Sequence, residues 1–106
     1  MLNYSREILV LSGEKTRAEF LDDRLLQLAL TRLIEIVGEA ANRVSEQTQA
    51  QCVSVPWRQI IDTRNRLIHG YDVIDLDILW NTIRIDIPQL AASLEAIAEE
   101  LNISKT

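Results

Sequence analysis

The chain of 106 residues has the length of one domain, and its 47% hydrophobic and 25% charged residues are typical of a globular protein. Three glycines and two prolines are too few for the many turns of an all-β fold. The net charge of −5, from 11 basic and 16 acidic residues, excludes a generally basic surface, so any contact with RNA or DNA would be local.

The cysteine count and the apolar runs exclude further classes of protein. Cys52 is the one cysteine, so no internal disulfide can form, and one thiol with one histidine argues against a structural zinc site. Residues 1–12 lack the long apolar core of a signal peptide. No apolar run approaches the roughly 20 residues that a membrane span needs. We therefore expect a single cytoplasmic domain over residues 1–106.

The first elements expected along the chain are two short helices. Leu2 to Leu11 is an apolar-rich segment that stops at Ser12-Gly13, a helix C-terminal signal, and it resembles the second half of a longer helix. Thr16 with Glu19 fits a capping box that opens a short helical turn.

The longest helix is expected over about residues 23–47, capped by Asp22 or Asp23. A second apolar line (Leu25, Leu28 and Ile36) broadens its hydrophobic face, which predicts a helix that is central or shared with a second subunit. The small residues Gly38, Ala40 and Ala41 would permit another helix to approach closely there. The main apolar positions recur every three or four residues: Leu26, Ala29, Leu30, Leu33, Val37, Ala40, Ala41 and Val44.

Two carboxylates lie on the more polar side of this helix, at Glu35 and Glu39. We interpret them as surface charges, with Glu39 pairing Arg43 four residues later.

The remaining elements complete an all-α fold. Residues 47–55 are expected to form a polar loop, after which Pro56 starts a third helix that runs from Trp57 to about His69. Asp75 caps a fourth helix, and Pro88 kinks it or starts a fifth. The fold class predicted is a small up-and-down bundle of four to five helices.

The third helix carries a charged residue within its apolar arc. At about 100° per residue, Arg64 lies near the centre of an arc of roughly 120°. Asn65 and His69 are four residues apart, so in a helix they would stack on one flank beside Arg64, while Arg66 points into water. The apolar members of the arc are Trp57, Ile60, Ile61, Leu67 and Ile68.

An unpaired buried arginine costs several kcal/mol even after relaxation, so Arg64 must meet a carboxylate, an anionic ligand or a cleft between subunits. The structural interpretation is a buried Arg64–Glu pair, with His69 interacting with the helix C-terminal dipole.

The functional interpretation is metal-independent RNA cleavage by attack of the 2′-OH on phosphorus. Arg64 would stabilise the charged transition state, His69 would move the proton, and Asn65 would hold the phosphate or the imidazole. The products would be a 2′,3′-cyclic phosphate or its 3′-phosphate. One histidine cannot serve as both acid and base, so a two-fold homodimer would combine two copies of the site.

These residues carry a resemblance to a known family. Arg64-Asn65-x-x-x-His69-x-Tyr71 resembles the Arg-x4-His-x-Tyr signature of the HepT-like toxins, in the HEPN superfamily of all-α ribonucleases. Three blocks agree in order, "IVGEAANRVSE", "VPWRQIIDTRNRLIHGYD" and "LDILWNTIRIDIPQL", and the resemblance extends from Asp22 to Leu101.

The resemblance implies a homodimeric helical bundle with a ribonuclease site at the dimer interface, built from both copies of the motif. It implies a toxin of a type VII-like toxin–antitoxin pair, whose antitoxin is an MNT-type nucleotidyltransferase. That partner would use ATP to transfer AMP onto Tyr71, and the toxin itself would need no metal or other cofactor. Without the resemblance, Tyr71 would be interpreted as an aromatic residue that caps the helix end. The resemblance also implies a longer first helix than the one expected here over Leu2 to Leu11.

A second hypothesis is a non-catalytic HEPN binding module, which serves as the dimeric partner or substrate of a nucleotidyltransferase. The isoelectric point near 4.8 favours this hypothesis, because a ribonuclease profits from positive potential. Arg64, Asn65 and His69 together favour the ribonuclease, because a scaffold would not need all three.

Overall fold

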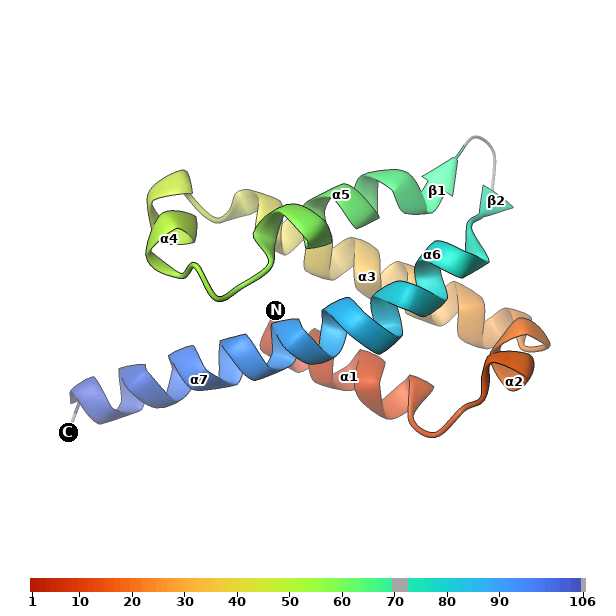
Figure 1. The fold of residues 1–106 in the computed structure, drawn as a ribbon, viewed down its shortest axis with the longest axis horizontal. Coiled ribbons are helices and arrows are strands. Elements are labelled where there is room, and N and C mark those ends of the chain that lie inside the picture. Colours follow the sequence, from red (N-terminus) through yellow and green to blue (C-terminus); the bar gives the residue numbers. More distant parts are fainter. Residues whose placement is uncertain (70–72, 106) are drawn as a thin grey trace.

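A computed structural model of the chain describes residues 1–69 and 73–105, which are mostly helical (Figure 1). The Cα atoms extend over 47 × 29 × 16 Å, so the bundle is elongated and thin. The elements in chain order are α1 (Leu2–Ser12), α2 (Arg17–Leu21), α3 (Arg24–Arg43), α4 (Glu46–Gln51), α5 (Trp57–Leu67), β1 (Ile68–His69), β2 (Val73–Ile74), α6 (Leu76–Asn81), the π-helical turn η1 (Thr82–Asp86) and α7 (Ile87–Lys105).

The four long helices α1, α3, α5 and α7 form the bundle, which confirms the predicted helical fold. The most extensive contacts join α3 to α5 and α1 to both α3 and α7. In Figure 1, α5 lies alongside α3, and the last turns of α7 project away from the bundle. None of the described helices is long and apolar enough to cross a membrane.

Local capping signals set several helix ends as predicted. Thr16 and Glu19 form the capping box of α2. Asp23 accepts a hydrogen bond from the Leu26 N–H at the start of α3. At the end of α1, Gly13 has a positive φ of 37° and its N–H donates to the Leu9 carbonyl, a conformation in which glycine avoids the strain of a β-carbon.

The end of the longest helix differs from the prediction, because α3 stops at Arg43 and Val44 is extended. Ser45 then caps a separate short helix, α4, by accepting a hydrogen bond from the Thr48 N–H. The predicted polar loop over residues 47–55 is therefore wrong in its first half. The Gln49 amide donates to the carbonyls of Ala41 and Val44, which compensates for the helical bonds that the break removes.

The core is a continuous apolar cluster contributed by every long helix. It consists of Ile8, Phe20, Leu30, Leu33, Ile34, Val37, Ala41, Val55, Ile60, Leu67, Leu79, Ile83, Ile87 and Leu90. Burial of such side chains contributes about 1.5–3 kcal/mol each and is the main source of stability.

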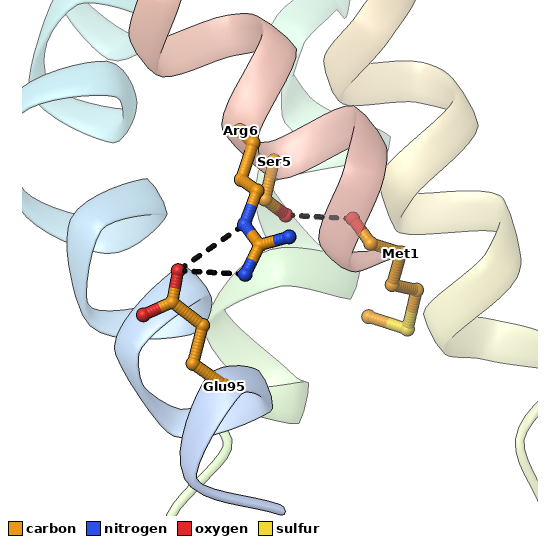
Figure 2. Close-up of polar contacts among 4 residues, drawn as sticks. All are labelled: Met1, Ser5, Arg6 and Glu95. Carbon is orange, nitrogen blue, oxygen red and sulfur yellow. Dashed lines mark hydrogen bonds and ion pairs between the residues drawn. The ribbon is translucent and has the colours of Figure 1, made fainter. Parts of the chain in front are cut away.

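An ion pair between α1 and α7 lies on the surface above this core. Figure 2 shows Arg6 of α1 directed toward Glu95 of α7, with Nε and Nη2 both 3.2 Å from the carboxylate. The same view shows the Ser5 hydroxyl donating to the Met1 carbonyl at 2.9 Å. An exposed ion pair contributes at most about 1 kcal/mol, so the apolar contacts beneath it fix the packing of the two helices.

The connection around Pro88 is continuous but irregular. Pro88 is the second residue of α7, directly after the π-helical turn η1, where the Ile87 N–H donates to the Thr82 carbonyl five residues earlier. In a regular α-helix, a proline lacks the N–H for one hydrogen bond and its ring collides with the carbonyl four residues earlier. The wider π-helical turn before Pro88 accommodates the missing bond and the ring. The predicted irregularity at Pro88 is confirmed.

The third helix ends earlier than predicted, at Leu67. Ile68 and His69 are extended and pair antiparallel with Ile74 and Val73 in a two-stranded ladder. The Asp75 N–H donates to the Leu67 carbonyl at 3.1 Å, taking an acceptor that a continuing helix would have used. Three of the four paired residues are β-branched, which favours extended backbone.

Candidate functional site

The predicted site residues lie on α5 and just after it, and α5 rests against α3. The buried face of α5 consists of Ile60, Thr63 and Leu67. Arg64 is half-buried beside this face and Asn65 is exposed. The predicted position of Arg64, near the centre of the apolar arc, is therefore corrected to the edge of the buried face.

Arg64 lies against Gly38 of α3, where no side chain intervenes. A β-carbon added to Gly38 would lie 2.5 Å from Arg64 Cβ and 2.7 Å from its Cγ. The aliphatic stem of Arg64 thus occupies the space above the glycine. Burial of the stem with an open head group is a common arrangement for arginine.

The head group of Arg64 opens into a groove between α3 and α5. The groove has a volume of about 400 Å³ and is lined by Arg32, Glu35, Glu39, Arg64 and Asn65. Within it, Arg64 Nη1 donates a hydrogen bond to Asn65 Oδ1 at 3.2 Å. The groove therefore contains a guanidinium and an amide side by side and accessible to solvent.

The two carboxylates of the groove are paired with arginines of their own helix. Arg32 contacts Glu35 at 3.3 Å, and Arg43 contacts Glu39 at 2.9 Å, which confirms the predicted Glu39–Arg43 pair. Among the residues that the structure describes, no carboxylate oxygen lies within 4.0 Å of the Arg64 guanidinium. The alternative of a buried Arg64–Glu pair is therefore not what this part of the chain shows.

Of His69, the structure describes the backbone, and Tyr71 lies outside the described residues. The backbone of His69 belongs to β1, beyond the end of α5, so the expected helical stacking of Asn65 and His69 is wrong. The His69 side chain and all of Tyr71 lie outside the described residues. The structure thus brings Arg64 and Asn65 together and leaves the position of the His69 imidazole a prediction.

Arg32 is a groove residue that sequence reasoning missed. The spacing could have indicated it, because Glu35 and Glu39 follow Arg32 by three and seven residues, and such positions share one face of a helix. Leu25 and Leu28 continue the same stripe toward the start of α3, and they are 80% and 44% exposed. The outward face of α3 is therefore apolar at one end and charged at the other.

Within the described part of the chain, no three histidine, cysteine, aspartate or glutamate side chains gather closely enough to hold a metal ion. Beside its two paired carboxylates, the groove offers the hydrogen-bond donors of Arg64 and Asn65, and these donors suit an anionic ligand.

The protein is thus a helical bundle with an arginine that opens into a groove. This arginine, Arg64, is the first residue of an Arg-x4-His-x-Tyr sequence. A family model described as "Ribonuclease HepT-like" matches residues 1–97. The chain belongs to the HepT-like ribonuclease family.

Several curated proteins from archaea and bacteria are similar to this chain. The relative from Thermococcus cleftensis, named "Probable ribonuclease HepT", is 35% identical over 79 residues, which cover 74% of this chain and 72% of the relative. A protein of Methanocaldococcus jannaschii is 27% identical over 97 residues, covering 92% and 89% of the two chains. One from Caldanaerobacter subterraneus subsp. tengcongensis is 33% identical over 82 residues, covering 77% and 73%. The names of the last two proteins describe them as inferred RNases. No solved structure shows a significant match to this chain.

Proposed function

We propose that this protein is a toxin endoribonuclease that cleaves RNA without a metal ion. The observation that carries the proposal is that Arg64 has no carboxylate partner in the described part of the chain and lies beside Asn65 in an open groove. An arginine in this state is available for a phosphate, with which it makes bidentate contacts.

The proposed reaction is an internal transesterification. The 2′-oxygen of one nucleotide forms a bond to the adjacent phosphorus, while the bond from phosphorus to the 5′-oxygen breaks. His69 accepts the proton of the 2′-OH, and an imidazolium gives a proton to the departing 5′-oxygen. Arg64 stabilises the additional negative charge on the phosphoryl oxygens in the transition state. The first product is a 2′,3′-cyclic phosphate, which hydrolyses to a 3′-phosphate.

The proposed active unit is a homodimer. Each chain supplies one histidine, whereas the reaction needs one base and one acid. The exposed Leu25 and Leu28 lie on the same face of α3 as the groove residues, so a two-fold contact there would bring two grooves together. The small 16 Å extent of the bundle supports this, because a thin chain leaves much apolar surface to be covered by another subunit.

The proposed control of the toxin is adenylylation of Tyr71 by an MNT-type nucleotidyltransferase antitoxin that uses ATP. Tyr71 follows His69 by two residues. An AMP group there would bring a negative phosphate to the neighbourhood of Arg64, where it would compete with the RNA phosphate.

The alternative, a non-catalytic partner or substrate of a nucleotidyltransferase, has one structural observation in its favour. Glu35 and Glu39 line the same groove as Arg64, and their charges disfavour a phosphate there. The pairing of each carboxylate with an arginine reduces this repulsion.

The two functions are separated by an RNA-cleavage assay on the purified protein without its antitoxin. We expect the wild type to cleave single-stranded RNA, and Arg64→Ala and His69→Ala to be inactive while remaining folded. Arg66→Ala is the matched control, because Arg66 is an exposed arginine two residues away. Equal activity in wild type and His69→Ala would contradict the ribonuclease proposal.

A further inference from the structure

Gly38 and Arg64 pack so closely that no residue with a side chain would fit at position 38 without a shift of the structure. Its built β-carbon would lie 2.5 Å from Arg64 Cβ, 2.7 Å from Arg64 Cγ and 3.5 Å from the Ile60 carbonyl oxygen. Carbon atoms that are not bonded normally approach to about 3.5–4.0 Å. The space that a β-carbon would fill is therefore already filled by the Arg64 stem.

The position of the colliding atoms decides how the molecule could respond to a larger residue. Rotation of the Arg64 side chain would move Cγ but not Cβ, which is fixed by the backbone of α5. Relief therefore requires α5 to move away from α3, by on the order of 1 Å. Such a movement would carry Asn65 with it as well as Arg64, because both residues belong to α5.

We propose that Gly38 is a positioning residue for Arg64. By lacking a side chain, Gly38 lets the Arg64 stem lie directly on α3, so that the guanidinium reaches the groove beside Glu35 and Glu39. This inference rests on the proposed ribonuclease function for its meaning, since Arg64 is the residue that would bind the scissile phosphate.

A role in helix packing alone makes a different prediction. In that case a larger residue at position 38 would lower the stability of the fold, and RNA binding well below the melting temperature would be unchanged. A positioning role predicts that binding falls even in the fully folded protein, and that the loss disappears when Arg64 is already absent.

The test is a double-mutant cycle on the affinity for a short 2′-O-methylated single-stranded RNA, which cannot be cleaved by 2′-OH attack. Wild type, Gly38→Ala, Arg64→Gly and the double variant are compared at a temperature where each is folded, because Arg64→Gly removes both Arg64 atoms that the new β-carbon would meet. We expect Gly38→Ala to raise Kd at least about tenfold, because a displacement near 1 Å can reduce function up to about a hundredfold. The double variant should bind no more weakly than Arg64→Gly. If the two substitutions instead raise Kd by factors that simply multiply in the double variant, the proposal is overturned.

The control is Asn42→Gln, which adds a methylene group at an exposed position of α3.

A second measurement does not depend on RNA. The ¹⁵N–¹H resonance of Arg64 Nε, assigned with Arg64→Lys, should shift in Gly38→Ala, whereas that of Arg84 should not. An unchanged Arg64 resonance overturns the positioning role. A shifted resonance in a protein whose wild type binds no RNA would uphold the positioning role and refute the proposed function instead.

A failure of Gly38→Ala to fold is also informative. Gly38→Ala combined with Arg64→Gly removes Arg64 Cβ and Cγ, the two atoms that collide. We then expect the double variant to fold. If it does not, the collision with Arg64 is not the reason and the proposal is overturned.

Discussion

Arg64 Nη1 donates a hydrogen bond to Asn65 Oδ1 at 3.2 Å, so two consecutive residues of α5 share one polar contact in the groove. This bond orients the amide oxygen toward Arg64 and leaves the NH₂ group of Asn65 able to donate. The guanidinium likewise retains further donors. The pair therefore presents several free donors to a ligand, which suits an anionic group such as a phosphate.

This relationship predicts the effects of substitutions at Asn65. Asn65→Ala should lower the cleavage rate by about tenfold to a hundredfold, because a hydrogen bond to a charged group contributes about 1.5–3 kcal/mol. Asn65→Asp should lower it further, since a carboxylate at this position would pair with Arg64 and repel phosphate. The measurement is kcat/KM on one RNA substrate. A higher rate for Asn65→Asp than for Asn65→Ala would contradict the assignment of Asn65 as a donor.

The exposed apolar end of α3 predicts the oligomeric state. Wild type should sediment with about twice the chain mass of 12.1 kDa at micromolar concentration. Leu25→Glu with Leu28→Glu should yield a folded monomer without ribonuclease activity, because charges at a closely packed interface cannot be solvated. Val53→Glu, at a residue that is 83% exposed in the turn after α4, should remain dimeric. A monomeric wild type, or a double variant that stays dimeric, would exclude this face as the interface.

The proposed regulation predicts the behaviour of Tyr71→Phe. Incubation of the wild type with the antitoxin and ATP should add AMP to the intact protein mass and abolish its RNase activity. Tyr71→Phe should cleave RNA with nearly the wild-type rate, gain no AMP and remain toxic when the antitoxin is co-expressed. Tyr4→Phe is the control, because Tyr4 is the other tyrosine and is partly exposed on α1. Full neutralisation of Tyr71→Phe would place the modification at a different residue.

Asp75, which caps the N-terminus of α6 shortly after the Arg-x4-His-x-Tyr motif, is predicted to stabilise the fold. Asp75 accepts a hydrogen bond from the Ile78 N–H at 3.1 Å, and its own N–H donates to the Leu67 carbonyl. Asp75→Ala should reduce the free energy of unfolding by about 0.5–2 kcal/mol, as removal of an N-cap does. Urea denaturation measures the change. Asp77→Ala provides the comparison, because its exposed ion pair with Arg17 should contribute less.

Local signals in the sequence were sufficient for much of the fold. The capping box at Thr16 and Glu19, the glycine stop at Gly13 and the cap at Asp75 each depend on residues a few positions apart, so they are readable without the tertiary structure. The break between α3 and α4 was missed although Ser45 is a good cap, because the apolar spacing continues through Val44.

The parts of the site that sequence reasoning missed depend on contacts between distant residues. Helical periodicity continues through Ile68, whereas pairing with Ile74 makes that residue extended. The same periodicity placed Arg64 at the centre of a buried arc. Its actual position depends on Gly38, 26 residues earlier in the chain, which lets the stem be buried while the head group opens into the groove. Spacing within one helix contains no information about the helix opposite.

Metal-independent cleavage by Arg64 and His69 is best tested by end-group analysis of RNA that has been incubated with the protein in the presence of EDTA. We expect the wild type to retain its full rate in EDTA and to leave a 2′,3′-cyclic phosphate or 3′-phosphate with a free 5′-OH. Arg64→Ala and His69→Ala should leave the RNA intact. Loss of activity in EDTA with recovery in magnesium, or products that carry a 5′-phosphate and a 3′-OH, would contradict this mechanism.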